Sequence, residues 1–68
     1  MADERYDEWT STLPSGKTVT YTYREAATCV VAEAKIEGSP QVYTHAGLPT
    51  HMTRAEIQAE FEHDLEGT

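Results

Sequence analysis

The fold is decided first by residues 53–65, TRAEIQAEFEHDL, which carry the signals of a helix start followed by a helix. Thr53 and Glu56 have the spacing of a capping box, in which the hydroxyl and the carboxylate each accept a hydrogen bond from a backbone N–H group. Met52 precedes this cap and Ile57 follows it, which is the arrangement of a hydrophobic staple. The stretch therefore predicts that a helix begins at residue 54.

The body of this helix has an apolar side. Ile57, Phe61 and Leu65 recur every four residues, and this spacing places them along one face of a helix. The positions between them are mostly charged or Ala. The pattern predicts an amphipathic helix over 54–65 that packs this apolar stripe against the rest of the protein.

A β-hairpin is predicted over residues 6–23. Both halves are rich in β-branched and aromatic residues, which favour strands. Residues 13–17, LPSGK, separate the halves; Pro favours a turn and Gly allows a positive φ. In the second strand, apolar side chains alternate with threonines, so one face should be apolar and the other exposed to water. The side chains expected on the apolar face are Val19, Tyr21 and Tyr23 of the second strand, with Trp9 and Leu13 from the first.

Residues 24–37 allow two interpretations. The alternation of residues 32–37, AEAKIE, fits a half-buried strand. The high Ala and Glu content, a second possible capping box at 22–25 and Gly38 as a terminator fit a helix instead. We favour the helix, whose small residues could lie close against a sheet. After it, residues 41–45 predict a short strand.

These elements predict a single small α+β domain over residues 1–68. A small antiparallel sheet, made of the N-terminal hairpin plus one or two further strands, carries the C-terminal amphipathic helix on one face. Val, Ile, Leu and Phe together number only ten, and a domain of about 60 residues buries only about 60% of its unfolded surface. A partner or a second copy should therefore add stability. The expected core residues are Trp9, Val19, Tyr21, Ile57, Phe61 and Leu65.

The net charge excludes several classes of partner. Twelve Asp and Glu stand against five Lys and Arg, for a net charge of −7. Phosphate contacts require Lys and Arg, so we expect no direct binding of nucleic acid, and the acidity also disfavours anionic membrane surfaces. The sequence has no run of about 20 apolar residues, and its acidic start lacks the pattern of a secretory signal. We therefore expect a cytoplasmic protein that does not contact a membrane.

Two features of the sequence could indicate binding of a phosphate or of a metal ion, but neither matches the complete pattern. Residues 15–18, SGKT, contain the end of a phosphate-binding loop, but the required upstream Gly is replaced by Ser11 and a strand is expected to follow. This segment should be a turn. The spacing of His45, His51 and His63 matches no pattern of metal ligands. We therefore expect no metal and no cofactor.

Catalysis is also disfavoured. Cys29 lies beside two valines, where a small buried thiol is the expected state. A catalytic site needs a cleft that excludes water, and so few large apolar residues leave little material to build its walls. We expect no catalytic residue, and we expect that the protein is not an enzyme.

The charges of helix 54–65 and of the residue after it are the main functional signal. Arg54 is the only base in the helix apart from His63, and like charges one turn apart repel each other. Such a surface indicates a basic partner, although acidity that only maintains solubility explains it equally well. The predicted partner-binding residues are Glu56, Glu60 and Asp64, four apart on one stripe, with Glu62 and Glu66 beside it.

We therefore predict a small acidic interaction protein that binds a basic surface of another protein and so inhibits or regulates it. Carboxylates one helical turn apart, about 5–6 Å, approximate the spacing of phosphates, so the partner could be a nucleic-acid-binding protein and the mechanism DNA mimicry. The alternative is a self-associating structural or assembly subunit, such as a homodimer, that pairs through the Thr-rich hairpin edge or an apolar surface. That surface would include Tyr6, Trp9 and Tyr43.

Overall fold

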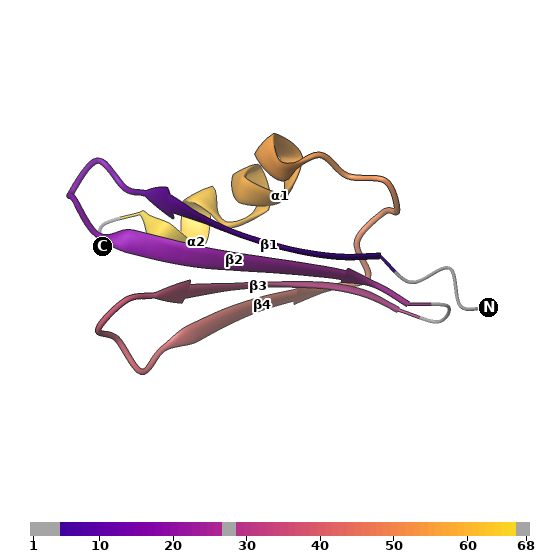
Figure 1. Ribbon diagram of the computed structural model, residues 1–68, viewed down its shortest axis with the longest axis horizontal. Coiled ribbons are helices and arrows are strands. Elements are labelled where there is room, and N and C mark those ends of the chain that lie inside the picture. The colour runs from indigo at the N-terminus through magenta and orange to yellow at the C-terminus, as the bar shows by residue number, and fades with distance from the viewer. Residues whose placement is uncertain (1–4, 27–28, 67–68) are drawn as a thin grey trace.

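A computed structural model describes residues 5–26 and 29–66 and shows a four-stranded antiparallel sheet with two short helices on one face (Figure 1). The strands follow one another in space as they do in sequence, and the predicted α+β class is confirmed. No helix in these two ranges is long and apolar enough to cross a membrane. The elements are β1 (Arg5–Thr12), β2 (Thr18–Glu25), β3 (Val30–Ile36), β4 (Val42–Ala46), α1 (Arg54–Glu60) and α2 (Glu62–Leu65).

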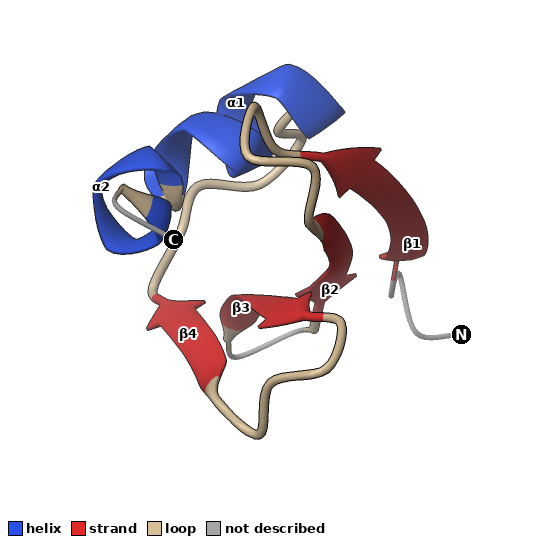
Figure 2. Ribbon diagram, turned by 90° about the vertical axis from the view of Figure 1, so that its left-hand side faces the viewer, coloured by secondary structure: helices blue, strands red, loops and turns tan. Residues whose placement is uncertain are grey.

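The sheet is curved, with β1 and β4 at its two edges and the helices lying between these edges on the concave side (Figure 2). The opposite side, called the outer face here, is covered by neither α1 nor α2 (Figure 2). Alternate residues of each strand point to the two sides, so the outer face carries the threonines of β2 while the tyrosines of β2 lie under the helices. The prediction of one face exposed to water is confirmed.

The predicted hairpin is formed by β1 and β2. Their register runs from Arg5 opposite Glu25 to Thr12 opposite Thr18. The turn between them is closed by the N–H group of Leu13, which donates to the carbonyl of Lys17 at 2.8 Å. Gly16 has a φ of 95°, a conformation that glycine adopts without steric cost. The segment SGKT is therefore a turn, as expected.

The helix that we favoured over residues 24–37 is wrong, because the second half of this segment is strand β3. Ala32 lies opposite Tyr23 and Ala34 lies opposite Tyr21, so the small side chains leave room for the large ones on the concave side. Ala and Glu favour helices, but such local propensity is easily overridden by tertiary contacts. Here the pairing with β2 overrides it, so the alternation that fitted a strand is the better guide. The short strand expected next is confirmed as β4.

The C-terminal helix begins as predicted but is not continuous. The Thr53 hydroxyl accepts a hydrogen bond from the Glu56 N–H group at 3.2 Å, and the Glu56 carboxylate accepts one from the Thr53 N–H group at 2.9 Å. This confirms the capping box. Phe61 separates α1 from α2, and its N–H group donates to Gln58, three residues back, at 3.0 Å.

The core lies between the sheet and the helices. Five of the six expected core residues are buried, and the sixth, Trp9, is half-buried and stacks on Tyr21 with ring centroids 5.5 Å apart. Met52 and Ile57 are both buried, as the staple requires. The buried apolar residues are Val19, Tyr21, Tyr23, Val30, Ala32, Ala34, Ile36, Met52, Ile57, Phe61 and Leu65.

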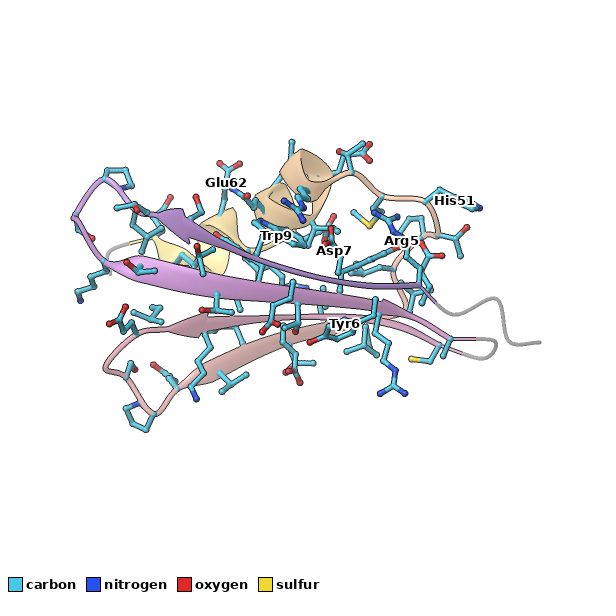
Figure 3. The ribbon with its side chains drawn as sticks, in the orientation of Figure 1. Arg5, Tyr6, Asp7, Trp9, His51 and Glu62 are labelled. Atoms are coloured by element: carbon cyan, nitrogen blue, oxygen red, sulfur yellow. The ribbon has the colours of Figure 1, made fainter. Side chains whose placement is uncertain are left out.

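Two other expectations fail in the structure. Cys29 is exposed, because it precedes the first inward-facing residue of β3, Val30. The three side chains expected to form one apolar surface for self-association also do not lie on the same side of the sheet. Tyr6 projects from the outer face (Figure 3) and is 63% exposed. Trp9 and Tyr43 instead pack against the core on the concave side.

Candidate functional site

The five carboxylates predicted to bind a partner differ in their surroundings. Asp64 is only partly exposed, because its Oδ2 atom lies 2.6 Å from Nε2 of His45. This contact ties α2 to β4. The other four are exposed and are called the acidic helix surface below: Glu56, Glu60, Glu62 and Glu66.

Glu56 is exposed, but it also stabilises the start of α1. Its carboxylate accepts the Thr53 N–H group in the capping box. The carboxylate of Glu60 makes no hydrogen bond or ion pair with another residue in the described part of the chain. Of the stripe formed by Glu56, Glu60 and Asp64, only Glu60 is thus both exposed and not engaged within the fold.

Arg54, the one arginine of the helices, is held away from these acids. Its guanidinium donates two hydrogen bonds to Asp7 of β1, at 2.8 and 2.9 Å, and lies over the Trp9 ring at 5.0 Å from the centroid. The hydrogen bond to Arg54 is the main cause that lowers the pKa of Asp7, and the same bond raises the pKa of the Arg54 guanidinium. The positive charge of Arg54 is therefore compensated by β1 and not by the helix carboxylates.

A groove lies between the tip of the β1–β2 hairpin and the helices, and we call it the hairpin–helix groove. Its volume of about 900 Å³ falls in the range of ligand-binding clefts, about 300–1,000 Å³. Leu13 and Pro14 come from the hairpin, and Ala55, Ala59 and Leu65 from the helices. Its other lining residues are Ser11, Thr12, Ser15, Tyr21, Gln58, Glu62, His63 and Glu66.

Contacts at the back of the groove fix its two walls relative to each other. The indole N–H group of Trp9 donates to Oε1 of Gln58 at 2.8 Å, which holds α1 against β1. Burial is the main cause that raises the pKa of the Tyr21 hydroxyl, and the negative charge of Glu62 raises it further. Glu62 thus acts electrostatically on Tyr21, a lining residue of the groove, although it projects from the helices away from the sheet (Figure 3).

A buried carboxylate lies at the other end of the molecule, and we did not predict it. Glu25 is 7% exposed and accepts hydrogen bonds from the Tyr23 hydroxyl and from the His51 N–H group, each at 2.6 Å. Arg5 Nη1 lies 3.6 Å from the same oxygen. The Tyr23 hydroxyl is the main cause that lowers the pKa of Glu25, followed by the His51 N–H group.

This arrangement gives Glu25 a role in the fold. It anchors the loop before α1 to the end of β2, and it does so where His51 has a φ of 62°, a conformation that is uncommon outside glycine. The sequence did contain a signal for it. Glu25 continues the inward-facing series Val19, Tyr21 and Tyr23 at a spacing of two residues, so strand alternation alone places it inside.

The three histidines have different surroundings. The His45 ring meets Phe61 edge-on, with centroids 4.7 Å apart, besides its contact with Asp64. His51 is exposed in the loop before α1, and His63 lines the hairpin–helix groove. Among the described residues, no three His, Cys, Asp or Glu side chains are grouped so that they could hold a metal ion.

The outer face of the sheet carries both signs of charge. Glu8 and Glu33 lie on either side of Thr22, while Lys35 lies opposite Thr20 on the next row. Bases and acids therefore alternate with threonines there. This face differs from the acidic helix surface, where all four charged groups are negative.

The comparisons with known proteins add no analogy to this geometry. No protein-family model, curated protein or solved structure matches the chain. The function is therefore inferred from the surfaces alone.

Proposed function

We propose that this chain is a small acidic, non-enzymatic interaction protein that binds a basic surface of another protein through the acidic helix surface and so inhibits or regulates that protein. The observation that supports this most strongly is the pairing of Arg54 with Asp7. Because Arg54 is the only Lys or Arg in residues 54–68, that pairing leaves the carboxylates of the acidic helix surface without an ion pair to a Lys or Arg among the described residues. Their mutual repulsion would be relieved by a positively charged partner.

The spacing of the carboxylates favours a partner that normally binds phosphates. Glu56 and Glu60 lie one helical turn apart, and Glu62 and Glu66 have the same sequence spacing. One turn separates side chains by about 5–6 Å, so each pair could compete for a Lys or Arg that contacts a nucleic-acid backbone. Asp64 was also predicted to contribute, and it would do so less because His45 occupies its carboxylate.

Charge reversal tests this proposal, and the structure decides which residues to change. Reversing Glu56 or Asp64 would also break the capping box or the contact with His45, so the test variant is Glu60→Lys, Glu62→Lys and Glu66→Lys. The matched control reverses three exposed carboxylates elsewhere, Glu8, Glu33 and Glu37.

Both variants and the parent are immobilised and exposed to cell lysate, and bound proteins are eluted with a salt gradient and identified by mass spectrometry. We expect a basic protein to be retained by the parent and the control, to elute as salt rises, and to be lost from the helix variant. Far-UV circular dichroism should be unchanged in both variants. If the helix variant retains the same proteins at the same salt concentration, its carboxylates serve solubility only.

A second candidate function, self-assembly, is favoured by the two edges of the sheet. Within the described residues, β1 pairs only with β2 and β4 only with β3, and unpaired strand edges can join a second copy. Light scattering distinguishes this candidate. An assembly through strand edges should have a mass above the monomer that does not depend on salt, whereas an electrostatic inhibitor can remain monomeric.

A further inference from the structure

The hairpin–helix groove is lined by apolar and polar side chains together, and its acids lie on only one wall. The hairpin wall, residues 11–15, carries no charged side chain, whereas the helix wall supplies Glu62 and Glu66. Ala55 and Ala59 are exposed along the helix and leave the groove open between these walls. A ligand seated there would meet apolar surface and negative charge at the same time.

These two properties restrict the chemistry of the occupant. A segment with only basic side chains would leave the apolar lining side chains, such as Leu13 and Ala59, in contact with water. The free energy available from burying them would then not contribute to binding. A purely apolar segment would remove water from Glu62 and Glu66 without compensating their charges, which is costly. Charge complementarity therefore selects a segment that has both kinds of side chain.

We propose that the hairpin–helix groove binds a short segment of the partner protein in which an aromatic or aliphatic side chain is flanked by Lys or Arg. The apolar side chain would lie between Leu13 and Ala59, and its basic neighbours would meet Glu62 and Glu66 on the helix wall. This inference rests on the proposed function and deepens it. It assigns the specificity of binding to one end of the acidic helix surface.

Three short synthetic peptides test this inference. The first has a central Phe flanked on both sides by lysines, the second replaces that Phe with Ser, and the third replaces the lysines with Glu. We expect the Lys/Phe peptide to bind on the order of tenfold more tightly than the Lys/Ser peptide, as burial of an aromatic ring predicts. The Glu/Phe peptide should not bind.

Amide chemical-shift mapping locates the peptide on the isotopically labelled protein. The shifts caused by the Lys/Phe peptide should be concentrated at residues 11–15 and 55–66. Ala59→Gln places a polar side chain over the groove and should remove the preference for Phe over Ser. Ala46→Gln is the matched control, because Ala46 is an exposed alanine at the end of β4, and it should bind all three peptides as the parent does.

Failure of this inference and failure of the proposed function give different results. If both Lys peptides bind equally and Ala59→Gln changes nothing, the groove is not the specific site, while charge-driven binding stands. If neither Lys peptide binds at low salt, both proposals are overturned. If the Glu/Phe peptide binds as well as the Lys/Phe peptide, the acids of the helix wall do not select the ligand and the inference is wrong.

Discussion

Replacing Phe61 with Ala should remove most of the stability of this protein. Phe61 is fully buried, and its ring contacts those of Tyr21 and His45, with centroids 5.9 and 4.7 Å away. Truncating a buried Phe to Ala costs about 3–5 kcal/mol. A chain of 68 residues has an unfolding free energy of about 3–10 kcal/mol at about 0.05–0.15 kcal/mol per residue. The variant should therefore keep at most about 7 kcal/mol and, at the lower end of this range, should be unfolded at 25 °C.

Urea denaturation followed by Trp9 fluorescence measures this effect. Trp9 is the only Trp of the chain and stacks on Tyr21, which in turn contacts Phe61. With a slope of about 1–3 kcal/mol per molar urea, the midpoint should fall by about 1 M or more. Glu60→Ala is the control, since it truncates an exposed neighbour and should stay within about 0.5 kcal/mol of the parent.

The reasoning is refuted by a Phe61→Ala variant whose midpoint lies within the error of the parent. Such a result would mean that Phe61 does not join the helices to the sheet, and that the placement of α1 and α2 over the concave side is incorrect. A second variant, Phe61→Leu, checks the size dependence. It keeps an apolar side chain and should cost clearly less than the Ala variant.

The loop before α1 provides two further predictions. His51→Gly should raise the unfolding free energy by up to about 1 kcal/mol, because it removes the cost of a positive φ while keeping the N–H group that Glu25 accepts; urea denaturation measures this, and a destabilised variant would contradict it. The second prediction concerns pH. In the folded protein the pKa of Glu25 lies below its ordinary value of 4.5. The Glu25 carboxylate therefore contributes its full stabilisation above about pH 4.5, and this stabilisation is lost as the pH falls through the lowered pKa. The difference in stability between the parent and Glu25→Gln should therefore shrink below about pH 4.5, and a difference that stays constant down to pH 2 would show that Glu25 is not held as a carboxylate.

The hairpin and the helix start could be predicted because their signals are local. A turn sequence with Gly16 and a capping box at Thr53 act within a few residues of themselves. Strand β3 could not be predicted in the same way, because its local composition suits a helix and its conformation is fixed by pairing with β2. The deciding fact, small alanines opposite Tyr21 and Tyr23, is a contact between segments that are distant in sequence.

The same distinction applies to the candidate site. The five carboxylates can be identified in the sequence. The residues that bind Asp64 and Arg54 of the helices, however, are distant along the chain. Asp64 meets His45 across 19 positions and Arg54 meets Asp7 across 47. The hairpin–helix groove is likewise formed only when the hairpin tip lies beside α1 and α2. Sequence patterns identify the charged residues, while the fold determines which of them remain exposed.

The contacts that hold the helices in place also set the charge that they present. At one edge of the sheet, Asp7 of β1 binds Arg54, and at the other edge, His45 of β4 binds Asp64. Each contact is a tie between a strand edge and a helix, so both stabilise the arrangement of helices across the curved sheet. The first also binds Arg54, the one arginine of α1 and α2, to the sheet and not to Glu60 or its neighbours. Asp7, a residue of the sheet, thus maintains the negative charge of a surface on another element, and any change at Asp7 that releases Arg54 would loosen α1 and neutralise part of the acidic helix surface together.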